Sequence, residues 1–229
     1  MQRIAMSTLV VALLIGCSGN PATKYDRPLP DPLLTTKKTE QPARPGASTP
    51  VRPGSPPAAW TPPGGIKRSM WKCIVVHHSA SDKATPQSMN SWHLQRGWEN
   101  GLGYHFVIGN GVNYPDGQIF VGPRWRSQQE GAHCKNAAGK FFGLWRKSGY
   151  YNDHGIGICL IGDFDKGRPT AKQRESLARL TAFLCAEAGV SPDHVHGHGE
   201  VTGKTKCPGT HLDVAWLRRS VKQINASSR

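Results

Sequence analysis

A proline-rich segment limits which part of this chain can fold into a globular domain. Twelve of its 18 prolines fall between Pro21 and Pro63. Proline lacks a backbone donor and favours extended conformations, and the few apolar residues in this segment cannot build a core. We therefore expect residues 17–66 to form an extended linker and residues 67–229 to form one domain of ordinary size. A tail without any spacing role is the alternative for the linker.

The first 16 residues have the pattern of an export signal. A charged start, Met1 to Arg3, precedes a short apolar run from Leu9 to Ile15 that is too short to span a bilayer. The run ends in LIGCS, which resembles the lipobox of bacterial lipoproteins. This resemblance implies removal of residues 1–16 and lipid attachment at Cys17. We expect an exported lipoprotein, anchored to a membrane of the cell envelope and facing the periplasm or held in the outer membrane. An ordinary signal peptide is the alternative.

The chain is strongly basic. It carries 29 Lys and Arg residues against 15 Asp and Glu residues, a formal net charge of +14 at pH 7. Such an excess favours a polyanionic partner. Nucleic acid rarely meets an exported, anchored protein, whereas an anionic cell-wall polymer shares its compartment. We therefore expect no nucleic-acid partner.

Apolar periodicity after residue 66 predicts alternating strands and helices. Buried strands are expected over 71–77 and 156–161, a short strand over 193–196, and antiparallel hairpins over 104–121 with turns at 109–111 and 116–117. Helices are expected to begin at Thr85-Pro86, at Thr170, where Gln173 completes a capping box, and after Asp213. This order predicts an α/β fold in which a mixed central β-sheet is flanked by α-helices.

Two distant segments carry residues of the kind that bind metals. The first predicted strand ends in His77-His78, and the glycine-rich segment 197–209 contains His198 and Cys207. Imidazole and thiolate are ligands of tetrahedral Zn²⁺, and three such ligands leave a position open for water, as in hydrolytic sites. Because side chains alternate along a strand, only one histidine of the pair can face a given metal, and spacing does not decide which one.

Five motifs occur in the order of one enzyme family. They are IVVHHSAS (74–81), GLGYHFVIGNG (101–111), EGAHC (130–134), GIGICLIGDF (155–164) and GHGEVTGKTKCPG (197–209). Together they resemble the zinc-dependent N-acetylmuramoyl-L-alanine amidases related to a phage lysozyme and to the peptidoglycan recognition proteins. The resemblance implies a mixed sheet flanked by helices with zinc in a surface groove. It also implies hydrolysis of the amide bond between N-acetylmuramic acid and L-alanine in peptidoglycan.

The same resemblance implies roles for single residues. His77, the first histidine of the pair, would bind Zn²⁺ together with His198 and Cys207. Tyr104 would be catalytic, through a hydrogen bond to the attacking water or to the developing oxyanion. Thr205 stands where the phage enzyme has a lysine and the amidase-active recognition proteins have a threonine. It is a further catalytic candidate, which supplies a hydroxyl but no charge.

Substrate-binding positions are implied in the same way. His133, in EGAHC, and Asn152 match positions that line the groove of the family, and local loop hydrogen bonding is the alternative for both. The segment 135–151 mixes basic and aromatic residues. We expect it to form a wall of the groove, with a lid or a partner surface as alternatives. The expected partners are peptidoglycan or muropeptides and, through the lipid at Cys17, a membrane; we expect a monomer.

Two other functions fit some of these residues. One is a module of the same fold that binds peptidoglycan without cutting it. Loss of a metal ligand is compatible with such a module, whereas His77, His198 and Cys207 are all present here. The other is a cysteine peptidase with Cys207 as nucleophile and a histidine as base. No helix is expected to begin directly after Cys207 and lower its pKa, which disfavours this function.

The remaining cysteines leave the disulfide pattern open. With Cys17 assigned to lipid and Cys207 to metal, four remain, namely Cys73, Cys134, Cys159 and Cys185. In an oxidising compartment they could form up to two disulfides in three connectivities. Cys159 and Cys185 lie in apolar surroundings, so burial as small hydrophobic residues is their alternative.

Overall fold

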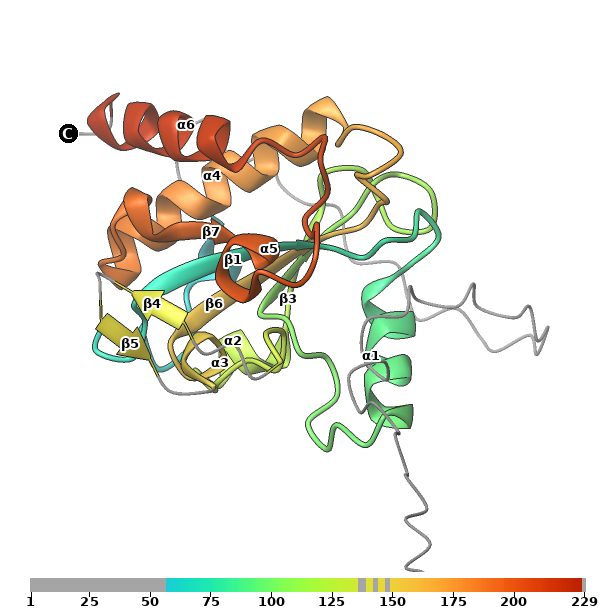
Figure 1. Ribbon diagram of the computed structural model, residues 1–229, viewed down its shortest axis with the longest axis horizontal. Coiled ribbons are helices and arrows are strands. Elements are labelled where there is room, and N and C mark those ends of the chain that lie inside the picture. The colour runs from blue at the N-terminus through green and yellow to red at the C-terminus, as the bar shows by residue number, and fades with distance from the viewer. Residues whose placement is uncertain (1–56, 136–138, 142–143, 147–148, 228–229) are drawn as a thin grey trace, which may run out of the picture.

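A five-stranded mixed sheet forms the centre of the protein (Figure 1). The computed structural model describes residues 57–135, 139–141, 144–146 and 149–227. Its strands are β1 (Cys73–His78), β2 (Phe106–Ile108), β3 (Ile119–Val121), β6 (Gly155–Leu160) and β7 (Val195–Gly197), in the spatial order β3-β2-β6-β1-β7. β3 runs antiparallel to β2, and the other neighbours are parallel. The predicted signal, Cys17 and most of the predicted linker lie outside the described residues.

Helices flank this sheet on both faces. They are α1 (Pro86–Gln95), α2 (Pro123–Arg126), α3 (Tyr150–Asp153), α4 (Ala171–Ala188), α5 (His198–Thr202) and α6 (Val214–Ser227). Short 3-10 turns, η2 (Ala58–Trp60) and η3 (Pro192–His194), precede β1 and β7. In Figure 1, α4 and α6 lie side by side on one side of the sheet, and α2 and α3 lie on the other. The predicted α/β class with a helix-flanked mixed sheet is confirmed.

Local chemistry explains where the longer helices begin and end. Thr85 Oγ1 accepts a hydrogen bond from the Ser88 amide, and Ser88 Oγ accepts one from the Thr85 amide. Thr170 and Gln173 form the same reciprocal pair at the start of α4. Each box satisfies two backbone groups that the helix leaves unpaired. Gly189 ends α4 with a φ of +72°, a conformation that glycine adopts without strain. These boundaries are as predicted.

Alternation along β1 divides its residues between two layers. Ile74 and Val76 belong to the large apolar core that includes the inner faces of α4 and α6. Cys73 and Val75 belong to a smaller cluster on the opposite face, and His77 follows them on that face by the two-residue period. The register places His77 beside Cys159 of β6. One face of the sheet therefore carries the main core, and the other carries a smaller apolar cluster together with His77.

The structure corrects the prediction of successive hairpins. β2 pairs directly with β3, so among the described residues a single hairpin forms, without a return strand between Gly111 and Asp116. Gly117 N–H donates to the Gly109 carbonyl, and Gly109 N–H donates to the Gln118 carbonyl, which close the loop at its base. Pro115, inside the loop, has no amide to give to a ladder.

The folded part extends upstream of the predicted boundary at residue 67. Trp60 is 7% exposed and belongs to the main core. Its carbonyl accepts a hydrogen bond from Trp125 Nε1 at 2.7 Å, and its ring meets Phe183 edge to face. A single aromatic residue among prolines gave no periodicity from which this packing could be predicted.

Three further findings concern the cysteines, the segment 135–151 and membrane-spanning helices. Cys73, Cys134, Cys159, Cys185 and Cys207 are all buried free thiols. Within the predicted wall segment 135–151, β4 (Gly139–Phe141) and β5 (Leu144–Arg146) form a separate antiparallel pair. In the part of the chain that the structure describes, none of the helices has the length and apolarity needed to cross a membrane.

Candidate metal centre and active site

Three side chains from separate segments converge at the end of β1. His77 stands near the carboxyl end of this strand, His198 is the first residue of α5, and Cys207 lies in the loop after α5. One ligand atom from each lies within 4.8 Å of the other two. His77 Nδ1 is 3.8 Å from Cys207 Sγ, and the His77 and His198 ring centroids are 4.5 Å apart. The structure thus brings together the three predicted zinc ligands.

The spacing of these donors fits a zinc ion. In a tetrahedral site with Zn–N bonds of about 2.0–2.1 Å and Zn–S bonds of about 2.3 Å, ligand atoms are separated by roughly 3.4–3.6 Å. The observed 3.8 Å between nitrogen and sulfur is close to that value. Two imidazoles and one thiolate are also a typical zinc donor set that leaves a fourth position open. His77, His198 and Cys207 would therefore be the residues that hold the ion.

Hydrogen bonds hold the segment between His198 and Cys207 in place. The Gly199 amide donates to the Cys207 carbonyl at 2.6 Å, and the Cys207 amide donates to Thr205 Oγ1 at 3.1 Å. At the start of α5, Glu200 Oε2 accepts from the Gly197 amide at 3.0 Å. These bonds fix the backbone that carries both predicted ligands of this segment. Thr205, a predicted catalytic residue, here supports the Cys207 backbone, and its hydroxyl hydrogen is left to donate.

Burial determines the protonation of the ligands. Burial, followed by the nearby His198 and His133, lowers the pKa of His77 well below its usual value, so this imidazole is neutral. Burial raises the pKa of the Cys207 thiol to about 12, partly opposed by the His78 amide. Without a cation, Cys207 is therefore a protonated thiol rather than a nucleophile. This argues against the cysteine-peptidase alternative, since a peptidase needs a thiolate.

Tyr104 packs against His77, one of the three predicted ligands. Its ring centroid lies 5.2 Å from that of His77. Burial is the main cause that raises the pKa of its phenol well above the usual value, and the thiols of Cys159 and Cys207 add to it. The hydroxyl therefore remains a neutral hydrogen-bond donor at any physiological pH. The structure thus places the Tyr104 ring beside His77, and the catalytic role of Tyr104 stays a prediction.

Comparison with known proteins identifies the relationship. A family model described as N-acetylmuramoyl-L-alanine amidase matches residues 67–210, which is more than half of the chain. The chain belongs to the N-acetylmuramoyl-L-alanine amidase family. Peptidoglycan-recognition protein LB of Drosophila melanogaster is 31% identical to this amidase-family chain over 150 residues, which are 61% of this chain and 55% of that relative. The chain thus matches little more than half the length of that protein.

Other relatives resemble the same part of the amidase-family chain. Peptidoglycan-recognition protein 2 of Holotrichia diomphalia is 27% identical over 149 residues, covering 62% of this chain and 68% of the relative. Among solved structures, the N-acetylmuramoyl-L-alanine amidase LysC of Clostridium intestinale is 26% identical with a TM-score of 0.53. That match covers 71% of this chain and 92% of LysC. Both enzymes and recognition proteins therefore share this fold.

The two predicted substrate-binding residues of the amidase-family site are engaged with the protein itself. His133 is 6% exposed, and its Nε2 lies 3.1 Å from the Gly155 carbonyl oxygen. Asn152 Oδ1 accepts from the amides of His133 and Cys134 at 2.9 and 2.8 Å, and its Nδ2 donates to the Cys134 carbonyl at 3.0 Å. These contacts are the local hydrogen bonds that formed the alternative to substrate contact.

Sequence reasoning missed the role of the residue next to His77. The His78 amide donates to Cys207 Sγ at 3.4 Å, which favours the thiolate form that a metal requires. Its ring points elsewhere, where Nδ1 accepts from the Phe164 amide at 3.1 Å. This backbone hydrogen bond could not be predicted from a residue pattern, because any amino acid at position 78 except proline would supply the donor.

Proposed function

We propose that this protein is a zinc-dependent hydrolase that cleaves the amide bond between N-acetylmuramic acid and L-alanine in peptidoglycan. The observation that carries the proposal is the convergence of His77, His198 and Cys207, complete as a zinc donor set, beside the phenol of Tyr104. A bound Zn²⁺ would act as the Lewis acid that polarises the scissile carbonyl and activates water. Membership of the amidase family supports the choice of bond.

The chain's own residues contribute three functions in this reaction. Neutral His77 presents a lone pair, and Cys207, stabilised by the His78 amide, presents the anionic ligand. The phenol of Tyr104 stays protonated, and its O–H donates a hydrogen bond to the carbonyl oxygen as negative charge develops there. His77 and Cys207 are buried, and the low dielectric around them strengthens their electrostatic interactions.

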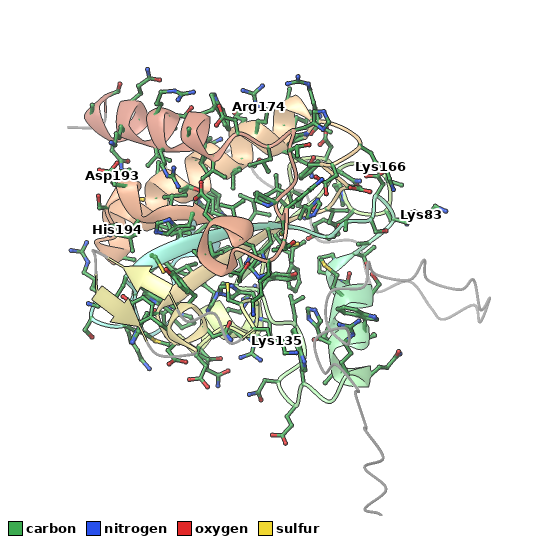
Figure 2. All side chains as sticks on the ribbon, viewed as in Figure 1. Lys83, Lys135, Lys166, Arg174, Asp193 and His194 are labelled. Atoms are coloured by element: carbon green, nitrogen blue, oxygen red, sulfur yellow. The ribbon has the colours of Figure 1, made fainter. Side chains whose placement is uncertain are left out.

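We also propose the setting in which this reaction takes place. The export signal and the lipobox-like Cys17 support an exported, membrane-anchored protein that acts as a monomer on peptidoglycan or muropeptides. The net charge of +14 suits an anionic wall polymer. Lys83, Lys135, Lys166 and Arg174 are exposed, and Figure 2 shows Arg174 on α4 well apart from Lys83, so the basic side chains are not confined to one element.

The proposal is tested with purified protein and defined muropeptides. We expect mass spectrometry to detect free stem peptide that begins with L-alanine, loss of this product on chelation, and its recovery with Zn²⁺. Cys207→Ser should abolish hydrolysis while peptidoglycan binding remains. Binding without any product from the wild type would identify a recognition module instead. Inhibition of metal-free protein by thiol alkylation alone would identify a cysteine peptidase.

A further inference from the structure

His77 uses both nitrogens of its ring. Nδ1 faces Cys207 Sγ at 3.8 Å, and Nε2 lies 3.0 Å from His133 Nδ1. Of these two rings, His77 is 1% exposed and His133 is 6% exposed, so water has little access to either. The nitrogen of His77 that carries the proton cannot bind a metal. His133 faces Nε2, so it influences which nitrogen carries the proton.

The Gly155 carbonyl determines which nitrogens of His133 and His77 carry hydrogen. His133 Nε2 lies 3.1 Å from the Gly155 carbonyl oxygen, which can only accept, so His133 Nε2 carries a hydrogen. In the neutral ring with its hydrogen on Nε2, Nδ1 carries the lone pair and is an acceptor. His77 Nε2–H then donates to His133 Nδ1, and the lone pair of His77 is left on Nδ1, toward Cys207.

Two glycines from different segments make room for the His133 ring. A Cβ on Gly131 would lie 2.3 Å from His133 Cδ2, and a Cβ on Gly157 would lie 2.4 Å from the same atom. Either approach is far inside van der Waals contact, so a side chain at either position would displace the ring. Asn152 fixes the backbone of His133 from the other side through the amides of residues 133 and 134. The position of this imidazole is thus determined by several parts of the fold.

We propose that His133 is a positioning residue that sets the tautomer and orientation of His77 so that Nδ1 is the metal-binding nitrogen. This inference rests on the proposed zinc function, and it gives His133 a place behind the ligand instead of a direct contact with substrate. A hydrogen bond from the second nitrogen of a metal-binding histidine fixes its ring and typically contributes about 10–100-fold to metal affinity.

A second donor set in the same region is better explained by this hydrogen bond. His77, His133 and Cys134 also place ligand atoms within 4.8 Å of one another. However, the His77–His133 and His133–Cys134 separations are 3.0 and 3.2 Å. These are shorter than the roughly 3.4–3.6 Å expected between ligands of one zinc ion. All three residues of this set are buried, whereas His198 of the first set is partly exposed.

The test compares two substitutions that differ only in the acceptor. His133→Asn places an amide oxygen near the position of Nδ1, whereas His133→Leu has no acceptor, and both lose the bond to Gly155. Zn²⁺ affinity is measured by competition with a chelator of known affinity, after circular dichroism has confirmed folding. We expect His133→Leu to bind Zn²⁺ about 10–100-fold more weakly than the wild type, and His133→Asn to recover most of that loss. Equal affinity of all three proteins, or equal loss in both variants, would overturn the proposal.

Two further measurements separate this inference from the proposed function. In the Zn²⁺-loaded wild type, ¹⁵N NMR of the imidazoles should show His77 protonated at Nε2 and metal-bound at Nδ1; the reverse arrangement would overturn the inference and leave the hydrolase intact. Cys134→Ala should retain Zn²⁺ and Cys207→Ser should lose it. The opposite result would show that His77, His133 and Cys134 bind the ion, and it would overturn the inference. A wild type that binds no Zn²⁺ would overturn both proposals.

Discussion

At the scale of single residues, the candidate site depends on neutral polar groups held in a dry environment. His77, His133 and Tyr104 are all kept uncharged by burial, and Cys207 becomes anionic only where a cation stabilises it. Each group then has one defined role as donor, acceptor or ligand. Tyr104 differs from the others because its proposed role begins only when charge develops on a substrate.

Tyr104→Phe separates this role from metal binding. Removal of one donor that stabilises a developing oxyanion costs about 10²–10³-fold in kcat. We expect a loss of that size in muropeptide hydrolysis, with Zn²⁺ content unchanged because the phenol is not a ligand. Tyr114→Phe, at a half-buried tyrosine outside the metal centre, is the matched control and should keep full activity. A Tyr104→Phe enzyme as fast as the wild type would contradict the proposed mechanism.

At the scale of elements, short segments complete the core and the candidate site. η2 adds Trp60 to the main core, and the segment from β7 through α5 carries His198 and Cys207 to the end of β1. Each attachment depends on a few specific contacts and not on a long apolar stripe. The Trp60 carbonyl, for example, is the partner of the buried Trp125 indole nitrogen.

Two truncated chains test the contribution of η2. A chain that begins at residue 57 keeps Trp60, and one that begins at residue 67 loses it together with the acceptor for Trp125. We expect the shorter chain to be less stable by about 3–5 kcal/mol, the usual cost of deleting a buried tryptophan side chain. Trp60→Ala in the longer chain should lose a similar amount. Urea unfolding measures all three, and equal midpoints would show that Trp60 does not contribute to the core.

How much could be predicted from sequence follows from how local the cause is. Thr85 and Thr170 begin helices through bonds within three residues, and their starts were predicted correctly. The metal triad was reached through motif resemblance, and the structure brings its members together. The space for the His133 ring could not be predicted, because Gly157 is distant in sequence and approaches the ring only in the folded chain, together with Gly131. The extra strand after Gly111 was wrong because the turn signals do not say which strands pair.

At the scale of the whole molecule, the interior contains several histidines that the fold keeps neutral. Burial lowers the pKa of His93, His105 and His196 from 6.5 to about 4. Unfolding exposes them to water, where their pKa returns to about 6.5. Between these two values the unfolded chain binds more protons than the folded one. Acid therefore favours the unfolded state.

The free energy of unfolding should accordingly be highest above about pH 6.5 and fall as the pH falls toward 4. Each such histidine lowers it by about 1.4 kcal/mol per pH unit within that window. Urea unfolding at pH 7, 6 and 5, with chelator present so that metal release does not contribute, measures the slope. His93→Asn removes one of these groups and should reduce the slope. A stability that does not change with pH would refute this account.

The order of strands has a consequence for when the centre comes into existence. His77 and Cys207 are 130 residues apart, and they meet only after β7 has paired with β1 at the edge of the sheet. Bringing together residues so far apart in the sequence costs loop-closure entropy, and such contacts slow folding. A nascent chain that ends before Cys207, or a fragment cut between these residues, therefore lacks part of the proposed zinc donor set. At the proposed zinc site, uptake of the ion would therefore report that β1 and the segment from β7 to Cys207 have come together.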